Sequence, residues 1–219
     1  MIGRTILLSA AVASSITVMA QSSGIRFIFP EFSKVYAEKS PWTSFQLGMG
    51  YDHDFNERIT MGLDVLLDLR REESGLYVDI PYGGYTAQYI LHDKFFSAQY
   101  RTAYSFSAND DGTHVYLGTF VGVRAFKQTA ELFSVTDPNG YNDNGSFVQL
   151  AEGTKTLIPV GLRFGIRGTL EGGYADLYTQ FGYVVGGGES VFTQAYLTGP
   201  EFDLASSSLT LGLAYGFGW

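Results

Sequence analysis

The stretch Leu209-Thr-Leu-Gly-Leu-Ala-Tyr-Gly-Phe-Gly-Trp219 alternates large apolar residues with small ones. Successive side chains of an extended strand point to opposite faces, so one face carries only bulky residues and the other is nearly empty. A soluble sheet usually turns its bulky face inward and polar side chains outward. A nearly empty face is expected instead where a narrow barrel interior has little room and the outer face meets lipid. The stretch therefore predicts a membrane-spanning β-strand.

The first twenty residues have the organisation of a secretory signal peptide. Met1 to Arg4 is a short basic segment, and Thr5 to Met19 is uncharged and largely apolar. Small or modest residues, Val18-Met19-Ala20, then precede Gln21. A transmembrane helix needs about 20 strongly apolar residues, and this stretch is shorter and contains serines and threonines. We expect cleavage after Ala20, which leaves residues 21–219 as a single mature domain.

Composition excludes several classes of protein. The chain has 14 Lys and Arg against 22 Asp and Glu, and its net charge of −8 argues against binding to nucleic acid or an anionic membrane surface. The absence of cysteine excludes disulfides, thiol catalysis and cysteine metal sites. The 27 glycines and 16% aromatic residues suit a barrel with small interior residues and aromatic belts at the membrane interfaces.

Alternation of large and small or polar residues recurs along the whole mature chain. The first candidate strand, 24–32, is the weakest because Pro30 interrupts it. The other candidates are 42–55, 58–70, 92–107, 113–126, 156–168, 173–186 and the terminal strand with the pattern of 209–219.

The connections between these candidates are alternately long and short. The long ones are 31–41, 71–91, 127–155 and 187–205, and 71–91 is predicted to be a hairpin that extends strands beyond the membrane. Transmembrane barrels have short periplasmic turns and longer extracellular loops, and hydrocarbon requires a closed ring. The sequence therefore predicts an all-β, eight-stranded antiparallel up-and-down transmembrane β-barrel with both termini periplasmic. Pro159 is expected near the outer rim, where strand pairing is incomplete.

Two segments resemble known outer-membrane barrels. The terminal strand is similar to the C-terminal strand of that family, with its pattern at Leu213, Tyr215, Phe217 and Trp219, although phenylalanine is usual at the last position. Thr156-Leu-Ile-Pro-Val-Gly-Leu-Arg-Phe164 resembles a strand common in the Bacteroidota-type outer-membrane β-barrel domain. The mature chain as a whole resembles the small OmpA/OmpX/OmpW-like eight-stranded barrels. The resemblance implies residence in the outer membrane of a Gram-negative bacterium and contact with the barrel-assembly machinery through the C-terminal strand. It implies no single activity.

The inward faces of the predicted strands collect charged residues. They are Asp52, Asp64, Asp68, Arg70, Arg101, Arg124, Arg163, Arg167 and Asp176. An eight-stranded barrel is only wide enough inside for side chains, and buried charges must pair or keep water. We expect an ion-pair network that fills the lumen. The alternative is a narrow gated pore in which an arginine–carboxylate pair exchanges partners.

The histidines show no arrangement typical of an enzyme or a metal site. A barrel deacylase is expected to carry a His-x-Ser motif, and neither His92 nor His114 is followed by serine at that spacing. Asp52-His53-Asp54 is expected at a periplasmic turn, with no further metal ligands at a supporting spacing. We predict no catalytic activity, no cofactor and no metal.

The loop stretch Tyr82-Gly-Gly-Tyr-Thr-Ala-Gln-Tyr89 is the candidate binding surface. Its tyrosines Tyr82, Tyr85 and Tyr89 are expected to be exposed, and exposed loops carry function more often than scaffolds do. They could contact an extracellular protein or glycan, or cover the mouth of the barrel.

Together these observations predict a structural or adhesion-type barrel that contacts outer-membrane lipid and lipopolysaccharide. The alternatives are a narrow pore or transporter for small or apolar solutes, similar to OmpW-like barrels, and, less favoured, a lipid A-modifying enzyme.

Overall fold

The computed structural model describes residues 22–36, 42–68, 71–79, 84–108, 112–136, 139, 142–143, 148–185, 191–192 and 207–218. Within these residues the protein is all-β, and no helix is long and apolar enough to cross a membrane. The strands are β1 (Ser22–Tyr36), β2 (Trp42–Asp54), β3 (Ile59–Asp68), β4 (Arg71–Asp79), β5 (Thr86–Ala108), β6 (Thr113–Thr136), β7 (Asn142–Asp143), β8 (Val148–Leu157), β9 (Pro159–Leu170), β10 (Gly173–Val184) and β11 (Ser207–Gly218).

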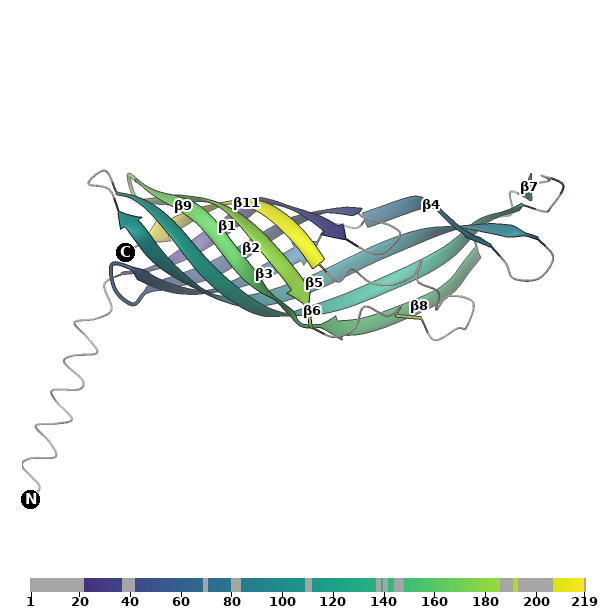
Figure 1. Cartoon of the computed structure of the whole chain (residues 1–219), viewed down its shortest axis with the longest axis horizontal. Coiled ribbons are helices and arrows are strands. Elements are labelled where there is room, and N and C mark those ends of the chain that lie inside the picture. Colours follow the sequence, from purple (N-terminus) through teal and green to yellow (C-terminus); the bar gives the residue numbers. More distant parts are fainter. Residues whose placement is uncertain are drawn as a thin grey trace, which may run out of the picture.

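Eight of the described strands form a closed antiparallel barrel, which confirms the predicted all-β, eight-stranded architecture (Figure 1). The ring runs β5-β3-β2-β1-β11-β10-β9-β6, and pairing between β5 and β6 closes it. β1 and β11 pair with each other, from Gly24 opposite Gly218 to Tyr36 opposite Ser207.

The connections at one end of the barrel are all short. They join β2 to β3, β5 to β6 and β9 to β10, and we call this the short-turn end. β1 begins and β11 ends at the same end, because Ser22 pairs with Asp54 and Gly24 with Gly218. We call the opposite end the long-loop end, because it carries the segments with β4, β7 and β8 and the connection 185–206; the connection expected at 31–41 is shorter, since only 37–41 separates β1 from β2.

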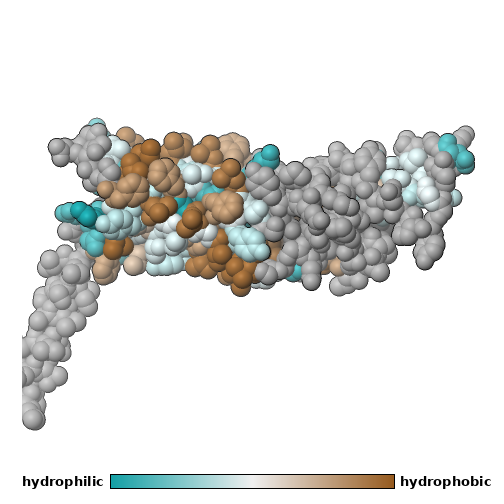
Figure 2. Space-filling view, in the orientation of Figure 1, coloured by the Kyte–Doolittle hydropathy of each residue, from teal (hydrophilic) through white to brown (hydrophobic). Residues whose placement is uncertain are grey.

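The bulky apolar side chains face outward, away from the barrel centre. They are exposed on every barrel strand and include Phe27, Met49, Leu63, Tyr100, Leu117, Leu162, Leu177 and Leu211. Figure 2 shows them gathered over the barrel part of the molecule. Polar residues and glycines occupy most of the alternate, inward positions, as at Asp64 and Gly62 of β3, together with a few apolar residues such as Leu66. A sheet that is apolar outside and polar inside is the pattern of a membrane-spanning barrel.

Two strands extend well beyond the barrel. β5 has 23 residues and β6 has 24, about twice the length that a membrane-spanning strand requires. β3 pairs with β5 only as far as Phe96, after which β4 pairs with it; β8 likewise takes over from β9 along β6. Figure 1 shows this part, with β4 and β7, lying away from the barrel. We call it the projecting sheet: residues 86–95 of β5 and 126–136 of β6, with β4, β7 and β8.

The projecting sheet confirms one expectation and corrects another. The hairpin expected within 71–91 is present, since β4 pairs antiparallel with β5. The long connection expected at 127–155, however, is mostly strand: β6 continues to Thr136, and β8 returns along it. Its residues mix polar and apolar side chains. Pairing with neighbouring strands holds them extended, and Ala130 and Ala151 join a buried cluster with Tyr89 and Phe192.

Pro30 and Pro159 lie where the hydrogen-bond ladder between strands is interrupted. β1 extends from Ser22 to Tyr36, longer than the predicted 24–32, and its pairing with both neighbours shifts between Ile28 and Glu31, around Pro30. Pro159 begins β9 and pairs with Val184, the last residue of β10. Proline cannot donate to the ladder, so it fits a position where one neighbouring strand ends, as expected from the sequence.

Candidate functional site

The centre of the barrel holds buried charged residues from five strands. Arg26, Asp64, Arg101, Arg163 and Asp176 come from β1, β3, β5, β9 and β10, and all are almost completely buried. Glycines opposite them provide the space that the long side chains need. Arg26 pairs across the sheet with Gly50 and Gly216, and Arg101 with Gly62. A Cβ atom at Gly62 would collide with the Arg101 guanidinium.

Two aspartates accept the contacts of three arginines at this centre. Asp64 lies 3.1 Å from Arg26 Nε, 2.9 Å from Arg101 Nε and 3.5 Å from Arg163 Nη1. Asp176 Oδ2 lies 3.0 Å from Arg26 Nη1 and 3.1 Å from Arg163 Nη2. Three of these contacts, Arg26 to Asp64, Arg26 to Asp176 and Arg163 to Asp64, connect strands that are not neighbours in the ring, so the side chains brace the barrel across its interior. We call these five residues the central cluster.

A second group of charges lies toward the short-turn end. Asp52 pairs with Arg101 and accepts a hydrogen bond from Arg167 Nη2 at 2.9 Å. Tyr174 also donates to Asp52, and the Arg167 guanidinium carbon lies 4.3 Å from the centre of the Tyr174 ring. Arg101 therefore connects this group to the central cluster.

Two buried tyrosines, Tyr116 and Tyr178, contact the central cluster. The Tyr116 hydroxyl donates to Asp176 Oδ1 at 2.7 Å and accepts from Arg163 Nε at 3.0 Å. The Tyr178 hydroxyl donates to Glu31 at 2.6 Å, and its ring lies 3.4 Å from the Arg163 guanidinium carbon. The guanidinium thus contacts both a carboxylate and an aromatic face, two favourable environments for an arginine.

The remaining predicted charges lie elsewhere. Asp68 accepts a hydrogen bond from Ser44 at 2.6 Å. Arg124 is buried, with its guanidinium carbon 4.4 Å from the centre of the Phe95 ring. Arg70 lies outside the described residues.

Arg26 and Glu31 were not among the residues that the sequence singled out. Arg26 had a visible signal, because it alternates with the apolar pair Ile25 and Phe27 and so faces inward. Glu31 had none, since the shift in pairing around Pro30 changes which residues face the interior. A change of register by one residue moves a side chain to the other face.

An apolar layer lies above the charged residues, where β10 ends. Phe95, Phe126, Leu157 and Val184 are buried together, and Val191 packs against them. The Phe95 and Phe126 rings are stacked with their centres 6.4 Å apart. This apolar layer lies between the charged centre and the long-loop end, and the buried Arg124 contacts its Phe95 ring.

The candidate binding tyrosines are not all exposed. Tyr85 is 42% exposed, but Tyr89 is only 6% exposed and packs with Leu91, Ala130 and Phe192. The expectation of an exposed Tyr89 is wrong, because the residue belongs to β5 and not to a loop, and the projecting sheet covers its ring. Tyr82 lies outside the described residues.

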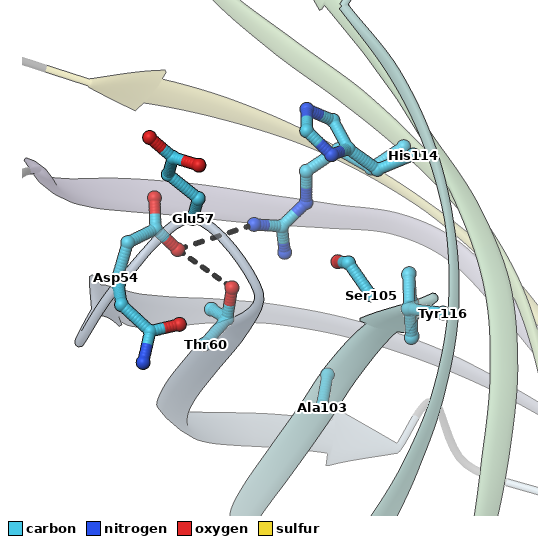
Figure 3. Close-up of a pocket in the computed structure, with 9 residues that line it drawn as sticks. Asp54, Glu57, Thr60, Ala103, Ser105, His114 and Tyr116 are labelled. Carbon is cyan, nitrogen blue, oxygen red and sulfur yellow. Dashed lines mark hydrogen bonds and ion pairs between the residues drawn. The ribbon is translucent and has the colours of Figure 1, made fainter. Parts of the chain in front are cut away.

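A cavity of about 190 Å³ lies inside the short-turn end (Figure 3). Asp54, Glu57, Ser105, His114, Tyr116 and Arg167 are among the side chains around it. Asp54 accepts a hydrogen bond from Thr60 at 2.6 Å and lies 3.8 Å from Arg167 Nη1. The mixture of charges is typical of a polar vestibule, and the described residues contain no group of three or more His, Cys, Asp or Glu side chains that could hold a metal ion.

The other two histidines each lie close to a polar side chain. His53 Nδ1 lies 2.9 Å from the Ser23 hydroxyl near the short-turn end. His92 Nε2 lies 3.2 Å from Glu131 in the projecting sheet.

The C-terminal strand completes the barrel wall next to β1. Leu213 and Phe217 are exposed, and Tyr215 is half-buried with its ring 4.7 Å from that of Phe217. Trp219 lies outside the described residues.

Comparisons with known proteins gave matches only among solved structures. No family model and no curated protein matches the sequence. The structure is similar to that of Ail, the attachment invasion locus protein of Yersinia pestis, in complex with the heparin analogue sucrose octasulfate. That match has a TM-score of 0.46 and 14% identity, and it covers 90% of this chain and 98% of that one.

Two further solved structures show a similar degree of likeness. The N-terminal β-barrel domain of Pseudomonas aeruginosa OprF matches with a TM-score of 0.43 and 12% identity, over 91% of this chain and 98% of that one. Neisserial surface protein A matches with a TM-score of 0.38 and 13% identity, over 90% and 95%.

Proposed function

We propose that this chain is an integral outer-membrane β-barrel with a structural or adhesion-type role, and that its charged side chains close the lumen. The observation that carries the proposal is the central cluster, in which Arg26, Arg163 and Asp176 meet from three strands in the middle of the barrel. A pore needs a continuous polar path. Here the charges are paired with one another and an apolar layer lies above them.

The outer surface supports residence in a membrane. Large apolar residues are exposed around the whole ring, which water would disfavour and acyl chains would not. We assign the short-turn end to the periplasm, since short turns lie there in bacterial barrels. We further propose that residues 1–20 are a cleaved signal peptide and that the C-terminal strand, with Leu213, Tyr215, Phe217 and Trp219, engages the barrel-assembly machinery.

The projecting sheet supports the surface-binding part of the proposal. In this orientation it stands on the extracellular side, and its strands are longer than a membrane requires. Its buried cluster around Tyr89 and Phe192 gives it a small core of its own. We propose that the projecting sheet, and not the barrel interior, meets an extracellular protein or glycan, with lipopolysaccharide around its base.

The cavity at the short-turn end favours a second candidate, a narrow pore for small or apolar solutes. It extends inward to Tyr116 and Arg167, which lie next to the central cluster. Opening such a pore would require the arginines and aspartates of the cluster to exchange partners and the apolar layer to move.

Replacing Arg163 by Gln separates the two candidates. If the cluster is a structural closure, the change leaves Asp176 and Asp64 less compensated and lowers the free energy of unfolding by about 3–5 kcal/mol. Single-channel recordings in planar bilayers should then show no large steady openings. The control is Lys127→Gln, which removes an exposed pair with Glu152 and should cost less than about 1 kcal/mol. Large steady openings at unchanged stability would support the pore instead.

A further inference from the structure

The outer wall of the barrel has a depression between β5 and β6. Thr102 and Thr119 lie directly opposite each other, between the larger pairs Tyr104–Leu117 and Tyr100–Val121. Short side chains flanked by long ones leave a hollow in a surface that is otherwise evenly covered. The resulting groove has a volume of about 330 Å³, and Ile59 and Leu162 border it from the neighbouring strands.

The floor of this groove is suited to hydrocarbon. The two threonine hydroxyls lie 3.0 Å apart and hydrogen-bond to each other. A hydroxyl without a partner is costly in an apolar medium, and this hydrogen bond gives each hydroxyl one partner without water. The walls, formed by Tyr104, Leu117 and Leu162, are apolar surfaces that an acyl chain can contact.

A charged hollow adjoins the groove at the short-turn end. It has a volume of about 340 Å³ and is bordered by Asn56, Glu57 and Arg58, and it shares Ile59 and Tyr104 with the groove. The Asn56 side-chain oxygen accepts hydrogen bonds from the backbone N–H groups of Arg58 and Ile59, both at 2.9 Å, which fixes the backbone of the turn at Arg58; Glu57 borders both this hollow and the cavity inside the barrel.

Arg58 is positioned at the boundary between the two hollows. Its Nη1 donates to the Tyr104 hydroxyl at 3.2 Å, which directs the guanidinium toward the groove. This hydrogen bond, with a smaller contribution from Glu57, raises the pKa of Arg58 above its ordinary value, so the residue is always cationic. A guanidinium is the side chain best matched to the oxygens of a phosphate.

We propose that the groove and the charged hollow together bind one phospholipid, phosphatidylethanolamine. An acyl chain lies over Thr102 and Thr119, the phosphate meets Arg58, and the ammonium meets Glu57. The neighbouring opposite charges match a zwitterionic headgroup, whereas Glu57 repels the additional negative charge of a purely anionic one. The site rests on the proposed function, because it requires the short-turn end to lie at the phospholipid-containing periplasmic leaflet.

Lipid retention by the folded barrel tests the site. The mature chain in detergent micelles is mixed with phosphatidylethanolamine, phosphatidylcholine or phosphatidylglycerol, and the bound lipid is counted by native mass spectrometry. We expect one retained phosphatidylethanolamine per chain. Arg58→Gln should lower its retention about fivefold, which corresponds to one cation at a lipid headgroup. Glu57→Gln should abolish the preference over phosphatidylglycerol.

A groove-filling variant tests the acyl-chain part separately. Thr119→Phe should reduce retention of all three lipids, because the ring occupies the floor. The matched control is Leu211→Phe, which adds the same ring to the exposed face of β11, on the opposite side of the ring of strands. Folding of each variant is verified by its heat-dependent migration on a gel.

The outcomes distinguish the site from the proposed function. Equal retention by the wild type, Arg58→Gln and Thr119→Phe, in barrels that fold, overturns the lipid site and leaves the membrane assignment intact. An equal loss in Leu211→Phe also overturns it, because the lipid would then be general surface lipid. A wild-type chain that does not fold in micelles contradicts the proposed function itself.

Discussion

Tyr116 has one hydroxyl that serves two charged groups in the barrel centre. It donates to Asp176 and accepts from Arg163, which brings β6 into contact with β9 and β10 inside the lumen. Both charged partners are almost completely buried, so neither can replace the hydroxyl with bulk water. A single oxygen atom therefore supports the packing of two ions.

Replacing Tyr116 by Phe should lower the free energy of unfolding by about 1–3 kcal/mol, the usual cost of an unsatisfied buried polar partner. The ring volume is retained, so the loss reports on the hydroxyl alone. Urea unfolding followed by tryptophan fluorescence in vesicles measures it. Tyr100→Phe, at an exposed position, is the control and should change stability by less than about 0.5 kcal/mol. Equal effects of the two changes would contradict the assignment.

At the same scale, the sequence predicted which charges face inward more readily than which ones meet. Alternation along a strand places Asp64, Arg101 and Arg163 on the inner face from local pattern alone. Their ion-pair partners depend on the register between neighbouring strands, and the sequence of a single strand does not determine that register. Arg26 could have been recognised by the same alternation, whereas Glu31 could not.

At the scale of the element, β11 shows why its inner face is nearly empty. Tyr178 of β10 lies over Gly212, and Tyr174 lies over Gly216. A Cβ atom at either glycine would collide with the tyrosine ring next to it. The small residues of β11 thus provide the space in which the tyrosines of β10 reach Glu31 and Asp52.

Gly212→Ala should destabilise the barrel by about 1–3 kcal/mol, because the added methyl group displaces the Tyr178 ring from a filled interior. Gly168→Ala is the matched control, since a Cβ atom there meets nothing within 4 Å. That control should be neutral or slightly stabilising through reduced freedom of the unfolded chain. Thermal unfolding in detergent compares the two. A Gly212→Ala variant as stable as Gly168→Ala would show that the ring can move freely.

The sequence predicted the strands well where one face of the strand meets hydrocarbon, and poorly where neither face does. The eight barrel strands all carry alternating bulky residues. The distal part of β6 and most of β8 carry a mixture of polar residues, such as Gln128, Glu131 and Glu152, which resembles a loop. Their extended conformation follows from continuous pairing, as between Lys127 and Thr154, and no local pattern reports it.

At the scale of the whole molecule, the apolar exterior implies a dependence on depth. On β10, Leu177 lies near the middle of the strand and Tyr183 near its long-loop end, and the two are 51% and 54% exposed. In water these positions would be equivalent. In a bilayer the first lies deep in the hydrocarbon and the second near the interface.

Leu177→Arg should therefore cost about 2–4 kcal/mol and Tyr183→Arg about 0–1 kcal/mol. The measurement is reversible folding into lipid vesicles, monitored by protection of the barrel from protease. A similar loss of folding free energy at the two positions would mean that the barrel exterior does not lie in a bilayer, and the membrane assignment would fail.

The pairing of β1 with β11 has a consequence for how the ring is completed. Every other pair of neighbouring barrel strands is consecutive in the chain or separated by one connecting segment, whereas β1 and β11 are the first and last of the described strands. Pairing two segments so far apart in the sequence carries the largest loss of conformational entropy. The pairing becomes stabilising only after the hairpins between them have formed. β11, which follows the other barrel strands in the chain, is thus also the strand whose pairing with β1 closes the ring.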